Sequence, residues 1–93
     1  MKRGDRVVVR SSLAGVFFGT LEGIDGDNVT LRAARKAWSW DGAFAVEGLA
    51  THGPAGGKFT AVVSRIDIFG VCQVLSTTDE AVKRWDSVME HRP

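Results

Sequence analysis

The sequence predicts a mainly β fold with one C-terminal helix. Glycines divide the chain into short segments of alternating or β-branched residues, which are typical of strands. Glycine also occurs inside these segments, where it favours the strong bending that a small barrel needs. An amphipathic stripe follows a helix-capping signal near the end of the chain. We therefore expect a small, bent, five-stranded barrel with a short helical insertion near residues 43–50 and a terminal helix near residues 78–91.

Length and composition set the size of this fold. The chain has 93 residues, and a second hydrophobic core would leave each half too small to fold unaided. Residues 1–93 are therefore expected to form a single domain. Hydrophobic residues make up 44% and charged residues 25%, which is typical of globular proteins and unlike a disordered chain.

The first three strands form a predicted meander. The run Val7-Val8-Val9 indicates the first strand, and the alternating segment from Val16 to Ile24 indicates the second. Asp25-Gly26-Asp27-Asn28 is a tight hairpin signal, because glycine and asparagine tolerate positive φ. The third strand begins at Val29.

The third strand decides which side chains are available for binding. Val29, Leu31 and Ala33 are the predicted core positions, so the even positions face away from the core if the strand has no bulge. The side chains on that second face are Arg32, Lys36, Trp38 and Trp40. One extra residue would reverse the assignment and bury both tryptophans.

The segment after the third strand is expected to be less regular. Asp41 is a candidate cap for the short helical insertion, and residues 52–57 are a predicted loop. Strand character returns at Lys58. A long alternating stretch follows, in which a kink near Ser64 or Gly70 separates two strands.

The terminal helix has clear local signals. Thr77 is a candidate cap, and Glu80 three residues later completes a capping box. Val82, Trp85 and Met89 form one apolar stripe, and Trp85 is expected to dock the helix on the sheet.

The segment from Arg35 to Asp41 has the most unusual chemistry. Two tryptophans at i,i+2 spacing are expected side by side on one strand face, where flat rings stack on a base while nearby cations hold a phosphate. The predicted ligand-binding residues are Arg32, Arg35, Lys36, Trp38, Trp40, His52 and Lys58. The alternative is that both tryptophans belong to the core or to a subunit interface. Both interpretations hold if the ligand-binding site lies between two subunits.

Several function classes are disfavoured by composition and motif. The net charge of +1 gives no general attraction to duplex DNA or to anionic membranes. One cysteine and two histidines are too few for a structural zinc site, and we expect no cofactor. The chain has no apolar run of membrane-spanning length and no signal peptide, so we expect no membrane contact.

Enzyme signatures are also weak. The glycine-rich segment 53–58 lacks the Walker pattern, which would need glycine in place of His52 and a hydroxyl residue in place of Phe59. Cys72 falls among predicted core positions, and no serine lies in a nucleophile-elbow context. The chain is therefore expected not to be an enzyme.

Two stretches carry a family resemblance. The segments from Gly4 to Leu21 and from Ala34 to Ala43 resemble a family of small tailed-phage proteins that is catalogued as a domain of unknown function, and Trp38-Ser39-Trp40-Asp41-Gly42-Ala43 is the most specific part of the likeness. The likeness covers most of the chain. It implies a viral origin and action in the cytoplasm of an infected bacterial host, and it supplies no known activity.

The strand pattern is also similar to Sm-like (SH3-like) barrels, which implies assembly into a ring or a smaller homo-oligomer. The C-terminal helix departs from that family, as does the lack of the usual RNA-contacting motifs. These departures disfavour uridine-type RNA binding.

These observations lead to one functional hypothesis with two alternatives. We expect an accessory, anti-defence phage protein that sequesters a small anionic ligand, a nucleotide or a cyclic nucleotide immune signal, without cleaving it. The first alternative is a protein-binding inhibitor of a host defence enzyme. The second is a single-stranded nucleic-acid-binding module of the Sm-like type.

Overall fold

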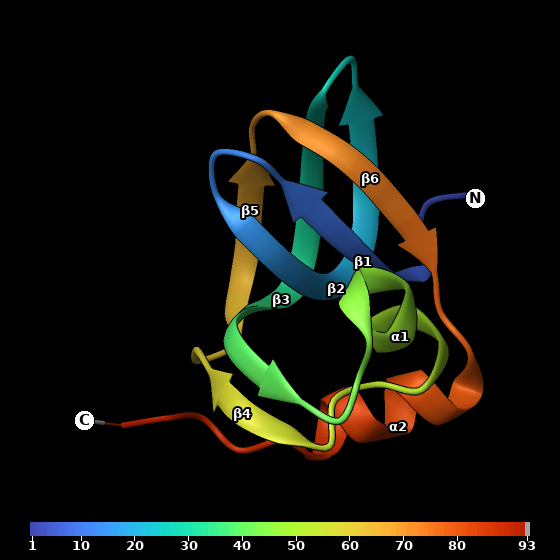
Figure 1. Ribbon diagram of the computed structural model, residues 1–93. Helices are drawn as coiled ribbons and strands as arrows, with labels where there is room; N and C mark the ends of the chain where they lie inside the picture. Colours follow the sequence, from blue (N-terminus) through green and yellow to red (C-terminus); the bar gives the residue numbers. More distant parts are fainter. Residues whose placement is uncertain (93) are drawn as a thin grey trace.

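A computed structural model describes residues 1–92 and contains six strands and two short helices (Figure 1). The elements are β1 (Arg6–Ser11), β2 (Gly15–Asp25), β3 (Asn28–Asp41), α1 (Ala45–Thr51), β4 (Gly56–Phe59), β5 (Val63–Ile68), β6 (Val71–Ser76) and α2 (Asp79–Ser87). The strands form one antiparallel sheet in the order β4-β3-β2-β1-β6, and β5 also pairs with β3. The predicted meander of the first three strands is confirmed.

The predicted mainly β fold is confirmed, but the predicted small, bent, five-stranded barrel is wrong, because the sheet has six strands and is not closed into a barrel. β3 is long enough to pair with two different strands along the same edge. Its first half pairs with β5 and its second half with β4. Only Phe69 and Gly70 separate β5 from β6, yet β6 pairs with β1 and forms no ladder with β5 in the described residues.

Both predicted helical segments are present, but the terminal helix is shorter than expected. The insertion near residues 43–50 corresponds to α1, Ala45–Thr51. The helix expected near 78–91 is α2, which ends at Ser87, because Val88 has extended backbone angles (φ −71°, ψ 145°). Residues 89–92 run along β4 as a tail, in which Glu90 forms a parallel bridge with Phe59 (Figure 1).

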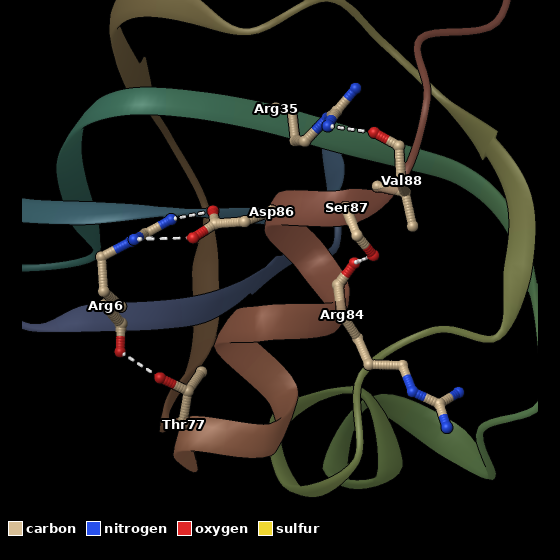
Figure 2. A network of polar contacts seen from close by, with 7 residues as sticks. All are labelled: Arg6, Arg35, Thr77, Arg84, Asp86, Ser87 and Val88. Carbon is tan, nitrogen blue, oxygen red and sulfur yellow. Dashed lines mark hydrogen bonds and ion pairs between the residues drawn. The ribbon is translucent and has the colours of Figure 1, made fainter.

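The cap of α2 is Thr78 rather than Thr77. The Thr78 hydroxyl oxygen accepts a hydrogen bond of 3.1 Å from the backbone N–H of Ala81. The Thr77 hydroxyl instead donates to the carbonyl oxygen of Arg6 at 2.7 Å, as Figure 2 shows. This second bond, together with the ion pair between Arg6 and Asp86 at 2.6 Å, ties α2 to β1.

The sheet buries apolar side chains on both faces, which explains the continuous run Val7-Val8-Val9. Val8 joins a cluster that includes the residues of α1 and α2, and Val7 and Val9 join a cluster built from strand residues alone. The strand-only cluster shows that the sheet is bent over itself, as expected from its glycines. On the helical side, Trp85 is fully buried and docks α2 on the sheet, as predicted.

The register of β3 against its neighbours shifts at three positions, and at two of them β3 carries the extra residue. Against β2, Thr20 lies opposite Arg32 while Phe18 lies opposite Arg35, so β3 has one extra residue at this point. Ala33 has a φ of 48°, in the left-handed region, and is exposed although it was predicted to face the core. Against β4, Trp38 is a second extra residue.

The two tryptophans therefore do not stand side by side on one open face, as the sequence predicted. Trp38 is 67% exposed, whereas Trp40 is half-buried and packs against the helical-side core. The bulge separates them, because an extra residue in a strand rotates the side chains that follow it.

Candidate ligand-binding cleft

Trp38 lies at the edge of a cleft of about 240 Å³ that is formed where β3, β4 and the C-terminal tail meet. The residues that line it are Lys36, Trp38, Lys58, Phe59, Thr60 and His91. Three of these were predicted as ligand-binding residues from the sequence: Lys36, Trp38 and Lys58. The cleft combines one exposed aromatic ring with two lysine side chains.

The bulge in β3 directs the Trp38 ring toward this cleft. Ala37 lies opposite Phe59 and Ser39 lies opposite Lys58, so Trp38 has no partner of its own across the ladder. The Lys58 ammonium nitrogen lies 5.0 Å from the centre of the Trp38 ring, within the range of a cation–π interaction. A cation is thus already positioned against the aromatic surface.

Gly57 is required for the close approach of β4 to β3. Its φ is +136°, a conformation that residues with a side chain rarely adopt. A Cβ atom at this position would also collide with the carbonyl oxygen of Ser39 and the Cα of Trp40. The neighbouring Lys58 therefore owes its position beside Trp38 to a glycine in the predicted loop.

Lys36 and Thr60 are joined by a pair of hydrogen bonds at the back of the cleft. The backbone N–H of Lys36 donates to the Thr60 hydroxyl oxygen at 2.9 Å, and the Thr60 N–H donates to the Lys36 carbonyl oxygen at 3.0 Å. The Lys36 side chain passes close to Gly15 and brings its nitrogen 5.9 Å from the Phe17 ring centre. Neither Lys36 nor Lys58 forms an ion pair with a carboxylate of residues 1–92.

Arg35 is buried beneath the cleft and holds two of its walls together. Its guanidinium Nε and Nη2 donate to the Thr60 carbonyl oxygen at 3.2 and 3.0 Å. Its Nη1 donates to the Val88 carbonyl oxygen at 2.9 Å, as Figure 2 shows. Burial lowers the pKa of Arg35, and the nearby carboxylates of Glu90 and Asp86 partly oppose that shift. Arg35 is therefore a positioning residue, since its polar atoms are already committed to the protein.

The tail supplies the last wall of the cleft. The His91 N–H donates to the Phe59 carbonyl oxygen at 2.8 Å, next to the bridge between Phe59 and Glu90. These backbone contacts, with the Arg35 bond to Val88, bring the His91 side chain to the cleft.

The other predicted site residues lie elsewhere. Arg32 precedes Trp38 by six positions, which is on the order of 20 Å along a strand, and its Nε pairs with Glu22. His52 is exposed at the end of α1, where its Nδ1 lies 3.6 Å from a Glu80 carboxylate oxygen. Trp40 contributes to the core and not to the cleft lining.

Thr60 and His91 are cleft residues that sequence reasoning missed. Thr60 follows the predicted return of strand character at Lys58, but nothing in the local pattern pairs it with Lys36. His91 was expected at the end of a helix, and the early end of α2 allows the tail to turn back to β4. Neither residue carries a sequence signal that reveals this long-range pairing.

The described residues show neither a metal-binding cluster nor a membrane-spanning helix. The part of the chain that the structure describes holds no group of three or more His, Cys, Asp or Glu side chains placed to bind a metal ion. Within residues 1–92, neither helix has the length and apolar character that a membrane span requires.

Cys72, predicted to be buried, is exposed because it is the extra residue of a bulge between β6 and β1.

Comparison with known proteins gives a family without an assigned activity. The family described as "Domain of unknown function (DUF6948)" matches residues 4–85, which is most of the chain. The chain belongs to this family. The DUF6948 match includes β1 through most of α2 and therefore contains Lys36, Trp38, Lys58 and Thr60, while His91 lies beyond it. No curated protein and no solved structure matches the chain.

Proposed function

We propose that this protein binds a small anionic ligand with a planar ring, of the nucleotide class, in the cleft beside Trp38. The observation that carries the proposal is the exposed Trp38 ring with the Lys58 ammonium 5.0 Å from its centre and Lys36 on the same cleft. A base stacks on the indole, while the two lysines neutralise a phosphate.

The expected affinity follows from the number of such contacts. Base–aromatic stacking contributes about 1–3 kcal/mol, and a charge-assisted hydrogen bond about 1.5–3 kcal/mol. One stacked ring with two such bonds gives a gross interaction of roughly 4–9 kcal/mol before the cost of association. Binding of a single nucleotide unit at micromolar to millimolar concentrations is therefore expected.

The lining supports binding without cleavage. None of the six cleft residues is a carboxylate, and the Thr60 hydroxyl donates to the Ala61 carbonyl oxygen at 3.2 Å. His91 is the one imidazole of the lining, and none of the other lining residues is a carboxylate that could orient it. Sequestration, in which the protein lowers the free concentration of its ligand, is the function that such a site favours.

We further propose that this capture serves an accessory, anti-defence role in the cytoplasm of an infected bacterium. The support is the resemblance of the Trp38-Ser39-Trp40-Asp41-Gly42-Ala43 segment to small tailed-phage proteins. The ligand is then a nucleotide or cyclic nucleotide immune signal. Sequestration needs about as many binding sites as signal molecules, which suits a small protein made in quantity.

Calorimetric titration tests the proposal with a defined panel: AMP, cyclic di- and trinucleotides, and ADP-ribose. We expect at least one member to bind, and the Trp38→Ala substitution to weaken that binding by at least about tenfold, which corresponds to the loss of one stacked ring. Phe44→Ala is the matched control, because Phe44 is a 93% exposed aromatic residue outside the cleft. Absence of binding across the panel, or equal effects of both substitutions, would contradict the proposal.

The two alternative functions predict different results with the same protein, the same variants and the same ligand panel. An inhibitor of a host defence enzyme would retain a host protein in a pull-down, lose it with Trp38→Ala, and bind no member of the panel. A single-stranded nucleic-acid binder would show affinity that falls steeply with salt, which a net charge of +1 disfavours.

A further inference from the structure

The outer edge of β5 is free for pairing with another strand. β5 pairs with β3 along one side, and no strand of the described residues pairs along its other side. Its ladder with β3 has no register shift, and β5 contains no proline. A regular, uncovered edge strand is a template for pairing with a further strand.

The exposed face of β5 has a self-complementary pattern. Val63, which is 43% exposed, shares this face with Arg65 and Asp67, and Phe69, which is 63% exposed, follows directly after the strand ends at Ile68. The order along the chain is apolar, positive, negative, apolar. When a second copy of this strand runs antiparallel to the first, the same order places each charge opposite a charge of the other sign and each apolar residue opposite another apolar residue.

We propose that two copies of this chain associate through antiparallel pairing of β5 with β5 around a two-fold axis at Ile66. In this register Arg65 lies opposite Asp67 of the second copy, and Val63 lies opposite its Phe69. Opposite charges and aromatic–β-branched pairs are both favourable across strands.

The two registers next to this one place like charges opposite each other. Residues that lie opposite each other point to the same face, so a two-fold axis perpendicular to the sheet has to coincide with a residue. An axis at Arg65 places two arginines opposite each other, and an axis at Asp67 places two aspartates opposite each other. Like charges directly opposite are destabilising. Axes at Ser64 or Ile68 place Arg65 and Asp67 opposite apolar residues, so among these registers the Ile66 register alone pairs opposite charges.

The monomer contains a charge conflict that this dimer relieves. Arg65 lies directly opposite Arg32 across the β3–β5 ladder. Arg32 pairs with Glu22, whereas Arg65 reaches only Asp67 on its own strand, at 3.4 Å. In the dimer, Asp67 of the second copy adds a carboxylate beside Arg65. The proposal is independent of the ligand-binding cleft, which lies at the opposite end of β3.

Charge reversal tests the pairing by sedimentation equilibrium of the full chain at about 10–300 µM, without ligand, because a single-strand interface is smaller than that of a typical stable dimer. We expect wild type to dimerise within this range. Arg65→Asp and Asp67→Arg each place like charges opposite each other and weaken the dimer by at least about tenfold. The double variant restores it, and so does mixing the two single variants. A monomeric wild type, or single variants that dimerise as well as wild type, overturns the proposal.

Disulfide trapping tests the register directly and does not depend on charge. In a Cys72→Ser background, Ile66→Cys places two cysteines opposite each other, at a Cα separation that a disulfide spans. Ser64→Cys is the matched control, since its counterpart in the dimer lies four residues away, about 14 Å. Mild oxidation is expected to link the first variant and not the second. Equal crosslinking of both contradicts the Ile66 register.

Discussion

The two halves of β3 use the same edge of one strand in different ways. The first half pairs with β5 in an unbroken register, while the second half pairs with β4 through a bulge at Trp38. The unbroken half leaves β5 as a regular outer edge. The bulged half directs an indole away from the core and opens a cleft beside it. A regular ladder thus offers a surface for another strand, and an irregular one offers a site for a small ligand.

The largest expected effect comes from the core beneath the bulged half. Trp85 is fully buried, stacks on Phe18 with ring centres 4.9 Å apart, and donates from its indole N–H to the Leu49 carbonyl oxygen at 3.1 Å. We expect Trp85→Ala to lower the free energy of unfolding by about 3–5 kcal/mol. Denaturant unfolding measures this loss. A loss below about 1 kcal/mol would show that α2 is not docked as described.

A smaller effect is expected at Arg35, which holds the cleft walls without facing the ligand. Arg35→Met removes the donors of the Thr60 and Val88 carbonyl oxygens, so we expect a loss of about 2–3 kcal/mol and release of the tail. Unfolding measures the stability, and hydrogen exchange at the His91 amide measures the release. Arg32→Met is the control, because the exposed pair with Glu22 is worth at most about 1 kcal/mol. Unchanged exchange at His91 would contradict the role of Arg35.

The smallest effect concerns the regular half of β3. The Thr30 hydroxyl donates to an Asp67 carboxylate oxygen at 2.6 Å, and this bond, aided by Arg65, lowers the pKa of Asp67. Because the folded-state pKa is lowered, the contribution is complete above the unfolded value of about 3.9 and is lost as the pH falls through the folded value. Thr30→Val is expected to raise the pKa of Asp67 toward its ordinary value. Carboxyl NMR titration measures it, and an unmoved pKa would show that the hydroxyl is not its cause.

The sequence predicted most of the local structure. Apolar alternation and glycine placement identified the meander and the bend, and a capping signal placed the start of α2 within one or two residues. The five-stranded barrel was predicted wrongly. β3 pairs with both β4 and β5, and this pairing depends on contacts between segments that are far apart in the sequence. The helix was predicted too long, since its apolar stripe included Met89, which is 84% exposed.

The candidate site was predicted only in part, and the reason is register. Lys36, Trp38 and Lys58 share a cleft, while Arg35 is buried beneath it and Trp40 belongs to the core. Each bulge moves every following side chain, and a bulge has no reliable local signal in residues such as Ala33 or Trp38. Thr60 and His91 reach the cleft through backbone pairing that only the folded chain reveals.

NMR of the three tryptophan indole N–H groups tests the central claim most directly, with signals assigned through Trp38→Phe and Trp40→Phe. During titration with the panel member that binds, the Trp38 signal is expected to shift most. The Trp85 signal is expected to stay fixed, because that indole is buried and bonded to Leu49. A bound ligand that leaves the Trp38 signal unmoved, or a panel that moves none of the three, would contradict capture at this cleft.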